Sequence, residues 1–346
     1  MPFAEWLGAR VAELRPAVSE RDMIHGGPAD KRECNLGHDA PQVRHQTVGD
    51  DADGMRLDNY LLRELKGVPR SRVYRLIRRG QVRVNSGRAK PHTKLAVGDR
   101  VRVPPVRQAP KDDPGRPPDG LLERVRAAVA EETPDWLLID KPAGLAVHAG
   151  TGLRFGVIEV LRADRPDEYL ELVHRLDRDT SGCLLVARNR PALTALRRAL
   201  RDPAADKRYL ALLAGAWEGG PRDVDAALVR DREIGGERLS AVAEEGKSAH
   251  SRFVPRERFR DAVLAEVAIA TGRTHQIRVH AAHLGHPVAG DDKYGDRDFD
   301  RRMRGLGLKR LFLHAASLSL PGIDRTLSAP LPPELEAVLD VLRDEG

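Results

Sequence analysis

The sequence is poor in cysteine and lacks any long apolar run. Its two cysteines, Cys34 and Cys183, lie far apart in a chain of 346 residues and form no C-x-x-C pair. This argues against a disulfide framework and a thiolate zinc site, and it fits a protein of the reducing cytoplasm. No eighteen apolar residues run together, so we expect no membrane span. The N-terminal segment also lacks the apolar run of a signal peptide.

Acidic side chains are missing from one segment that otherwise has the pattern of a folded domain. Between positions 64 and 99 there is no acidic residue, whereas ten lysines and arginines occur there. Arg72, Arg75 and Arg79 fall on one face of an expected helix because they are spaced i, i+3 and i+7. A solvated helix face is the alternative interpretation. The complete lack of carboxylates favours a nucleic-acid-binding surface that contacts phosphates.

A proline-rich segment divides the chain into a small and a large region. Residues 1–50 show little periodicity, so we expect a poorly ordered extension, with a short helix near 5–14. A small domain is expected at 54–106 and a semi-rigid linker at 107–121, followed by a larger region at 122–346 that is long enough for a catalytic domain.

Periodicity and turn residues predict the local structure of both regions. The small region is expected to contain helices at 56–65 and 72–79, the second capped by Ser71, strands at 81–85 and 98–103, and a turn at 85–87. The large region is expected to contain strands at 136–140, 183–187, 209–215 and 263–270, and helices at 191–202 and 333–345. Because strands and helices do not alternate regularly, we expect an α+β fold with a mixed or antiparallel sheet.

The small region is similar to a known RNA-binding module. The segment MRLDNYLLRELKGVPRSRVYRLIRRGQVRVNSGRAKPHTKLAVGDRVRV resembles an S4 domain, a small αL-type domain of a ribosomal protein and of several RNA-modifying enzymes. The resemblance covers about residues 54–106 and implies binding to structured RNA rather than to duplex DNA.

Several ionisable groups precede an apolar strand in ELVHRLDRDTSGCLLVARN, residues 171–189. An aspartic-protease loop needs D-T-G or D-S-G in two copies, and only one related stretch is present. A two-carboxylate metal site needs more oxygen ligands nearby. A single ionised Asp acting as a nucleophile needs one adjacent cation, for which Arg175 and Arg273 are candidates. Spacing alone leaves these three chemistries open.

Three further segments are candidates for a site. DKPAGLAVHAGTG, residues 140–152, has the glycines of a close-packed or ligand-facing loop but no P-loop pattern. Tyr209 begins an apolar strand, where a core aromatic is the alternative to a functional role. In TGRTHQIRVHAAHLGHP, Thr274 is expected to cap a helix that stops at Gly285, so that Arg273 at its start needs an anionic partner.

The same segment contains four histidines, so a zinc site is an alternative. His275, His280, His283 and His286 include no H-E-x-x-H pattern, and carboxylates are lacking until Asp291. We therefore favour structural or RNA-facing histidines and expect no bound metal.

The large region resembles the RluA-type pseudouridine synthases. LVHRLDRDTSGCLLVA matches the signature of that family, and KPAGLAVHAG, KRYLAL, TGRTHQIRVHAAHLGHPVAGDDKYG and RLFLHA match its other motifs in order. The resemblance covers about residues 135–330. Together with the S4-like region, the chain is most similar to the branch of the family that modifies large-subunit ribosomal RNA.

The resemblance implies a pseudouridine synthase fold and a role for each matched residue. It implies that Asp177 is the essential catalytic residue, that Tyr209 lies against the uracil, and that Arg273 pairs with Asp177. Arg175 is implied to fill the space left by the flipped-out uridine, and Ile277 to contact the base. Attack on the sugar, attack on the base and a glycal-forming elimination all remain open as routes.

Together, the two resemblances imply one function for the whole chain. The expected protein is a cytoplasmic isomerase, a monomer without cofactor, metal or membrane partner, that acts on 23S ribosomal RNA or its large-subunit precursor. The alternatives are a non-catalytic RNA-binding protein of the same fold and a histidine-dependent metallohydrolase.

Overall fold

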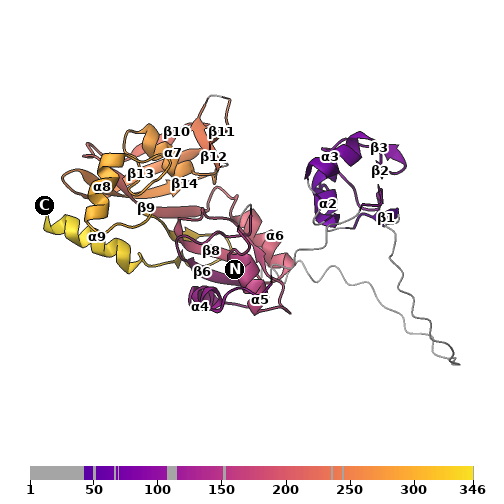
Figure 1. The fold of residues 1–346 in the computed structure, drawn as a ribbon, viewed down its shortest axis with the longest axis horizontal. Coiled ribbons are helices and arrows are strands. Elements are labelled where there is room, and N and C mark those ends of the chain that lie inside the picture. Colours follow the sequence, from indigo (N-terminus) through magenta and orange to yellow (C-terminus); the bar gives the residue numbers. More distant parts are fainter. Residues whose placement is uncertain are drawn as a thin grey trace. The chain divides into compact units, whose positions relative to one another are not determined.

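The computed structural model describes residues 43–49, 52–65, 68, 70–106, 115–150, 153–234, 237–243 and 245–345, apart from the side chains of 230–239. Contacts divide the chain into two compact units, with one boundary between Pro114 and Gly115 (Figure 1). The helix expected near 5–14 and most of the expected linker lie outside the described residues. Within the described part, no helix is long and apolar enough to cross a membrane.

The smaller unit packs two helices against a four-stranded sheet with the order β1-β4-β2-β3. Its elements are β1 (Arg44–Thr47), α2 (Leu57–Glu64), α3 (Arg70–Arg78), β2 (Arg83–Val84), β3 (Gly87–Arg88) and β4 (Arg100–Val103). Asn85 and Ser86 have φ of 49° and 68°, which is the left-handed conformation that a tight hairpin between β2 and β3 requires. The two helices, the turn and strands close to the expected positions are therefore confirmed.

The smaller unit also differs from the sequence prediction in two places. Strand β1 lies within the range expected to be a poorly ordered extension, yet it pairs with β4, and Val48 and Ala52 are buried in the same core. Folded structure thus begins before residue 54. Ser71 lies inside α3 rather than at its N-cap, because the helix already begins at Arg70.

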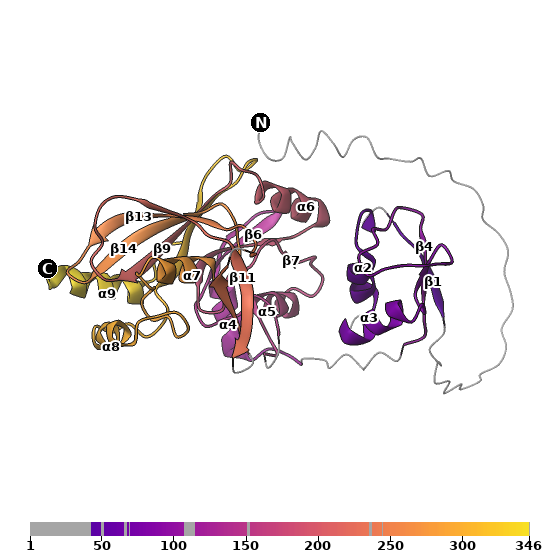
Figure 2. The same ribbon diagram turned by 90° about the horizontal axis from the view of Figure 1, so that it is seen from above.

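The larger unit is built on a ten-stranded mixed sheet, which confirms the α+β expectation (Figure 2). Its main path runs β10-β13-β14-β9-β15-β8-β6-β5, with β7 paired to β8 and β16 to β15. The strands are β5 (Val129–Glu132), β6 (Trp136–Lys141), β7 (Glu171–Leu172), β8 (Ser181–Ala187), β9 (Asp206–Ala214), β10 (Arg222–Asp225), β13 (His250–Arg258), β14 (Ala262–Ile269), β15 (Leu313–Ser319) and β16 (Leu327–Ser328). A separate hairpin joins β11 (Leu228–Ile234) to β12 (Glu237–Val242).

Helices cover both faces of this sheet. They are α4 (Asp119–Ala127), α5 (Val157–Asp164), α6 (Arg190–Ala199), α7 (Gln276–His283), α8 (Arg297–Gly305) and α9 (Pro333–Asp344). The alternation of side chains along a strand sends Leu213 of β9 into the core with α7, and Leu212 into the core with α9. Tyr209 follows the register of Leu213 and so faces the α7 side. Helix α4 begins at Asp119, inside the range expected to be linker.

Candidate active site

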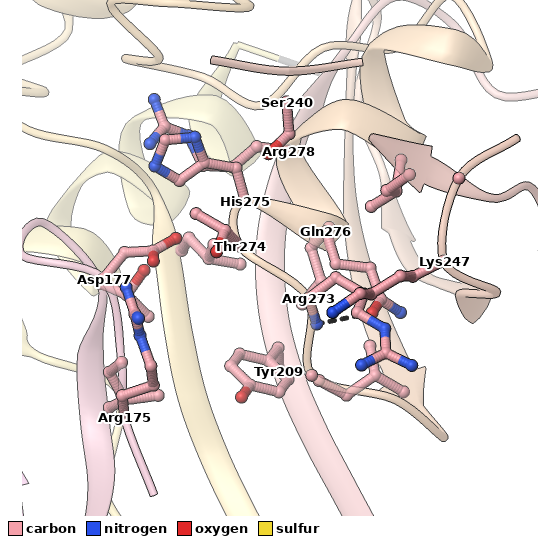
Figure 3. A pocket seen from close by; sticks show the side chains of 18 of the residues that line it. Arg175, Asp177, Tyr209, Ser240, Lys247, Arg273, Thr274, His275, Gln276 and Arg278 are labelled. Carbon is pink, nitrogen blue, oxygen red and sulfur yellow. Dashed lines mark hydrogen bonds between the residues drawn. The ribbon is translucent and has the colours of Figure 1, made fainter. Parts of the chain in front are cut away.

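A cavity of about 600 Å³ opens in the larger unit where several separate segments meet. Its walls come from the loop before β8, from β9, from the β11–β12 hairpin, and from the segments 245–247 and 269–278. Figure 3 shows Asp177 and Arg175 on one side of the cavity and Arg273 and Lys247 on the other. The cavity therefore gathers residues that lie more than a hundred positions apart in the sequence.

The loop that carries Asp177 is anchored by a buried lysine. Lys141 is fully buried, and its Nζ donates to the carbonyl oxygens of Pro142, Leu145 and Arg178 at 2.9, 2.8 and 2.9 Å. Burial lowers the pKa of Lys141 to about 7. The loop of residues 140–146 is thus joined to the residue that follows Asp177, so its role is to support the site rather than to line it.

A hydrogen bond fixes the same loop against strand β8, and a glycine in β8 allows β15 to approach closely. The amide of Leu185 donates to Nε2 of His174 at 3.1 Å, and burial lowers the pKa of that imidazole to about 4, so it is neutral. Gly182 has φ of 104°, and a Cβ at this position would overlap the carbonyl of Ala315 on β15. The glycine after Thr180 and Ser181 is therefore required by the close approach of β15.

Tyr209 lies on the wall of the cavity beside Asp177. Burial raises the pKa of the Tyr209 phenol, and the charge of Asp177 raises it further. The phenol is therefore neutral and keeps its proton near neutral pH. Its position on β9 also packs it against two hydrophobic clusters, so it combines a core contact with an exposed edge in the cavity.

The buried cation of the site is Arg278, which the sequence prediction missed. Its side chain is 5% exposed and makes a two-pronged ion pair with the fully buried Asp291, with Nε at 2.6 Å from Oδ2. Burial opposes the charge on Arg278, but Asp291 outweighs that cost and Asp177 adds to its effect, so the pKa of Arg278 is raised. Arg278 is thus a fixed positive charge that interacts electrostatically with the carboxylate of Asp177.

The predicted ion pair between Asp177 and Arg273 is not formed in the part of the chain that the structure describes. Arg273 is exposed, and its Nε donates to the carbonyl of Ser248 at 3.2 Å. Its backbone amide donates to Oε1 of Gln276 at 3.1 Å. Helix α7 begins at Gln276 after His275, which has φ of 55°, so Thr274 is not the N-cap, whereas the expected stop at Gly285 is confirmed.

His275 is held at the cavity wall by a network from two other segments. Its Nδ1 lies 3.0 Å from the hydroxyl of Tyr294, which also accepts the amide of Ser240 on β12 at 2.8 Å. Arg278 lies over the ring of Tyr294 at 5.2 Å from its centroid. Burial lowers the pKa of His275 against the opposing effect of Asp177. The motif GDDKYG thereby braces the residue before α7.

The other histidines of this segment do not converge. His280 is buried, with Nδ1 at 3.0 Å from Oγ of Ser251 and Nε2 at 3.1 Å from the carbonyl of Ala226. His286 has its Nδ1 at 2.8 Å from the carbonyl of Ala214, and His283 is exposed. Among the described residues, no three or more histidines, cysteines or carboxylates are grouped to hold a metal ion.

The remaining predicted residues fall in two places. Arg175 and Ile277 line the cavity, the first exposed and the second 4% exposed in the core below α7. Arg72 and Arg75 stand exposed on α3 of the smaller unit, and Arg79 is exposed directly after the helix ends.

The chain is similar to known proteins over both units. A family model described as RNA pseudouridylate synthase matches residues 135–283, and a model described as S4 domain matches residues 55–101. Proteins called "Ribosomal large subunit pseudouridine synthase C" match from Haemophilus influenzae at 49% identity, covering 87% of this chain and 96% of the relative, and from Escherichia coli strain K12 at 47%, covering 88% and 98%.

Solved structures give the same result for the larger unit. Human RNA pseudouridylate synthase domain containing 4 superposes with a TM-score of 0.55 at 24% identity, covering 65% of this chain and 96% of that one, which shows the fold. Human RNA pseudouridylate synthase domain containing 1 superposes with a TM-score of 0.50 at 27% identity, covering 63% and 93%.

Proposed function

Because this chain belongs to the RNA pseudouridylate synthase family, we propose that it converts specific uridines of 23S ribosomal RNA, or of its large-subunit precursor, to pseudouridine. The observation that carries the choice of RNA is the similarity to relatives named for the large ribosomal subunit, which covers 96% of the Haemophilus protein and includes the S4 domain. The reaction is an isomerisation without redox change, and we propose that a monomer performs it in the cytoplasm without a cofactor.

The proposed catalyst is the carboxylate of Asp177. Every route open to it, attack on the sugar, attack on the base or support of an elimination, uses an ionised oxygen near C1′ of the target nucleotide. The bonds of Lys141 and His174 hold its loop in one position, which supports the precise placement that such a step needs. We propose that Arg278, and not Arg273, supplies the fixed cation next to it.

The proposed role of Tyr209 is to lie against the uracil and to donate a hydrogen bond to it. In the reaction the C1′–N1 bond breaks, the base turns, a C1′–C5 bond forms, N1 gains a proton and C5 loses one. A phenol whose pKa is raised by burial keeps its proton at neutral pH and can donate a hydrogen bond to the detached base. A cavity of about 600 Å³ has room for the base to turn.

A stacked uridine must leave the RNA helix before it can reach Asp177, at a cost of about a few kcal/mol. We propose that Arg175, which is exposed at the cavity, enters the gap that the uridine leaves. Ile277 supplies an apolar contact to the base from the core side. The exposed arginines of α3 would hold neighbouring RNA through its phosphates.

The test is pseudouridine mapping of ribosomal RNA from cells that lack the protein, complemented with wild type, Asp177→Ala or Asp177→Asn. We expect specific large-subunit positions to be modified with wild type and unmodified with both variants. The variants should still bind the RNA with wild-type affinity, because Asp177 is not a phosphate contact. Modification by either variant would remove Asp177 as the catalyst, and an unchanged map in cells lacking the protein would remove the proposed substrate.

A further inference from the structure

Two cations on the cavity wall opposite Asp177 have no role in the reaction described so far. Lys247 and Arg273 both line the cavity and are exposed within it. In the described part of the chain, neither forms an ion pair with a carboxylate, although Glu245 lines the same cavity. Two neighbouring cations repel each other unless an anion lies between them.

The backbone places these two cations together. Lys247 is fixed to the first residue of β11 by two hydrogen bonds of 2.9 Å, from its amide to the carbonyl of Leu228 and from the amide of Leu228 to its carbonyl. A Cβ at Gly246 would lie 2.6 Å from the carbonyl carbon of Leu228, so this approach needs glycine. The backbone carbonyl of the next residue, Ser248, accepts a hydrogen bond from Nε of Arg273. Both terminal nitrogens of that guanidinium are left for another partner.

We propose that Lys247 and Arg273 form a subsite for one phosphodiester group of the RNA strand, next to the target uridine. Figure 3 shows the two side chains across the cavity from Asp177. In the proposed complex, the sugar and base of the target uridine lie between the bound phosphate and the carboxylate of Asp177. An ammonium and a guanidinium are the groups that bind phosphate oxygens most strongly in proteins. This inference rests on the proposed function, because it takes RNA as the ligand.

The subsite explains why the cavity combines anionic and cationic walls. The exposed arginines of α3 can bind any phosphate of the chain, whereas this pair binds one phosphate at a fixed distance from the reacting sugar. Its energy is available only when the uridine has entered the cavity. We therefore expect the pair to act on turnover of the flipped nucleotide more than on overall RNA affinity.

The test pairs a protein change with a matching change in the RNA. The substrate is an RNA fragment that wild type modifies, made with a neutral methylphosphonate either on the 5′ or on the 3′ side of the target uridine. We expect one of the two linkages, when neutralised, to lower kcat/KM of wild type by about tenfold or more, as loss of a charge-assisted hydrogen bond does. Lys247→Met should cause a similar loss on unmodified RNA and no further loss on that neutralised RNA.

Controls separate the subsite from general electrostatics and from folding. Lys247→Arg should restore most of the rate, and Arg273→Met should repeat the result of Lys247→Met. Lys309→Met makes the same change at an exposed lysine outside the cavity and should leave the rate within about twofold of wild type. All of these positions are exposed, so the variants are expected to fold.

The subsite is overturned if Lys247→Met has the wild-type rate, or if its loss multiplies with the loss from the methylphosphonate at both linkages. Neither result would contradict the proposed pseudouridine synthase activity. If wild type modifies no RNA, the proposed function fails. In that case, the affinities of wild type and Lys247→Met for the two methylphosphonate RNAs are measured at equilibrium. If both methylphosphonates weaken the binding of the two proteins equally, the subsite is overturned as well.

Discussion

The two units of this protein use positive charge in opposite ways. In the smaller unit, the arginines of α3 stand exposed on one surface, and Arg75 carries no ion pair in the described residues. In the larger unit, Arg278 is buried against Asp291 and touches the ring of Tyr294. Exposed charges make weak, nearly additive and salt-dependent contributions to stability and binding. Removing one partner of a buried ion pair is strongly destabilising, because it leaves the other charge buried without a partner. We propose that the exposed arginines hold the RNA and that the buried arginine acts on the reaction.

Removing the buried cation should give the largest effect. Arg278→Met leaves Asp291 buried without its partner, so we expect a loss of about 3–5 kcal/mol in the free energy of unfolding. We also expect kcat/KM to fall by about a hundredfold or more, because the fixed charge near Asp177 is lost. Urea unfolding and single-turnover rates measure the two effects.

The matched control is Arg301→Met, which removes an arginine whose ion pair with Asp298 is exposed. This change should leave both stability and rate close to those of wild type. Equal behaviour of Arg278→Met and Arg301→Met would mean that burial is not what distinguishes the two regions.

The second test concerns the close packing that supports the site in the larger unit. Gly182→Ala adds a Cβ that overlaps the carbonyl of Ala315, in addition to the strain of a positive φ. We expect a loss of about 2–4 kcal/mol in the free energy of unfolding. Gly219→Ala is the control, since Gly219 has φ of 77° but open space around it, and about 1–2 kcal/mol of strain alone is expected there.

If the two glycine variants unfold at the same urea concentration, the approach of β15 is not what requires Gly182. The rate of pseudouridine formation gives a second reading. Only Gly182→Ala should lower that rate, because it moves the loop that carries Asp177.

A smaller effect is expected from pH, and it depends on the buried Lys141 of the larger unit. Burial lowers the pKa of Lys141 to about 7 in the folded protein, whereas it is about 10.4 in an unfolded chain. The unfolded state therefore binds more protons between these values, so this group's contribution to stability rises with pH across that window and is lost as pH falls through 7. The free energy of unfolding of wild type relative to Lys141→Met should rise from pH 7 to pH 9.

If the difference in the free energy of unfolding between wild type and Lys141→Met stays constant from pH 7 to pH 9, burial does not lower the pKa of Lys141.

The smallest effect is expected on α3. Arg75→Ala should weaken RNA binding by a few-fold and lower the slope of log affinity against log salt by about 1, without changing the rate at saturating RNA. Filter binding at several salt concentrations measures the slope. An unchanged slope would remove Arg75 from the RNA contact surface, and a changed saturated rate would mean that the smaller unit also acts on the chemistry.

Local patterns in the sequence predict the elements well because period-2 and period-3.6 spacing is a local property. The strands around 136–140, 183–187 and 263–270 and the helices near both expected positions in the larger unit follow from it. The order of the strands does not, because β15 pairs with residues that lie more than a hundred positions earlier. Strand β1 is missed for a similar reason: four polar residues become a strand only by pairing with β4.

The candidate site is predicted in part. Family motifs bring Asp177, Arg175, Tyr209 and Ile277 to one cavity, as the structure does. The choice of Arg273 as the partner of Asp177 is not supported, since two arginines in one motif differ only in burial. Burial of Arg278 depends on Asp291, which comes from a different motif. A signal was present in the sequence: a carboxylate pair, Asp291 and Asp292, follows a helix that contains an arginine.

The roles of Lys141 and His174 also depend on folding. Both stand in motifs that the sequence singles out, but their contacts are with backbone groups of other segments. A carbonyl or an amide has no sequence signature, so no pattern of side chains reveals such a bond. These residues are found only once the loops are placed.

The position of β15 between β9 and β8 has a consequence for how the protein is made. During synthesis, residues 181–187 and 206–214 leave the ribosome about a hundred residues before 313–319, yet the sheet is continuous only when that last strand is inserted. The strand that closes the centre is therefore among the last parts of the chain to appear, and such distant pairings form slowly. The RNA-binding unit can fold early, whereas the catalytic centre is assembled only when nearly all of the chain has been translated. We expect a premature stop before residue 313 to release a chain that binds RNA and does not modify it.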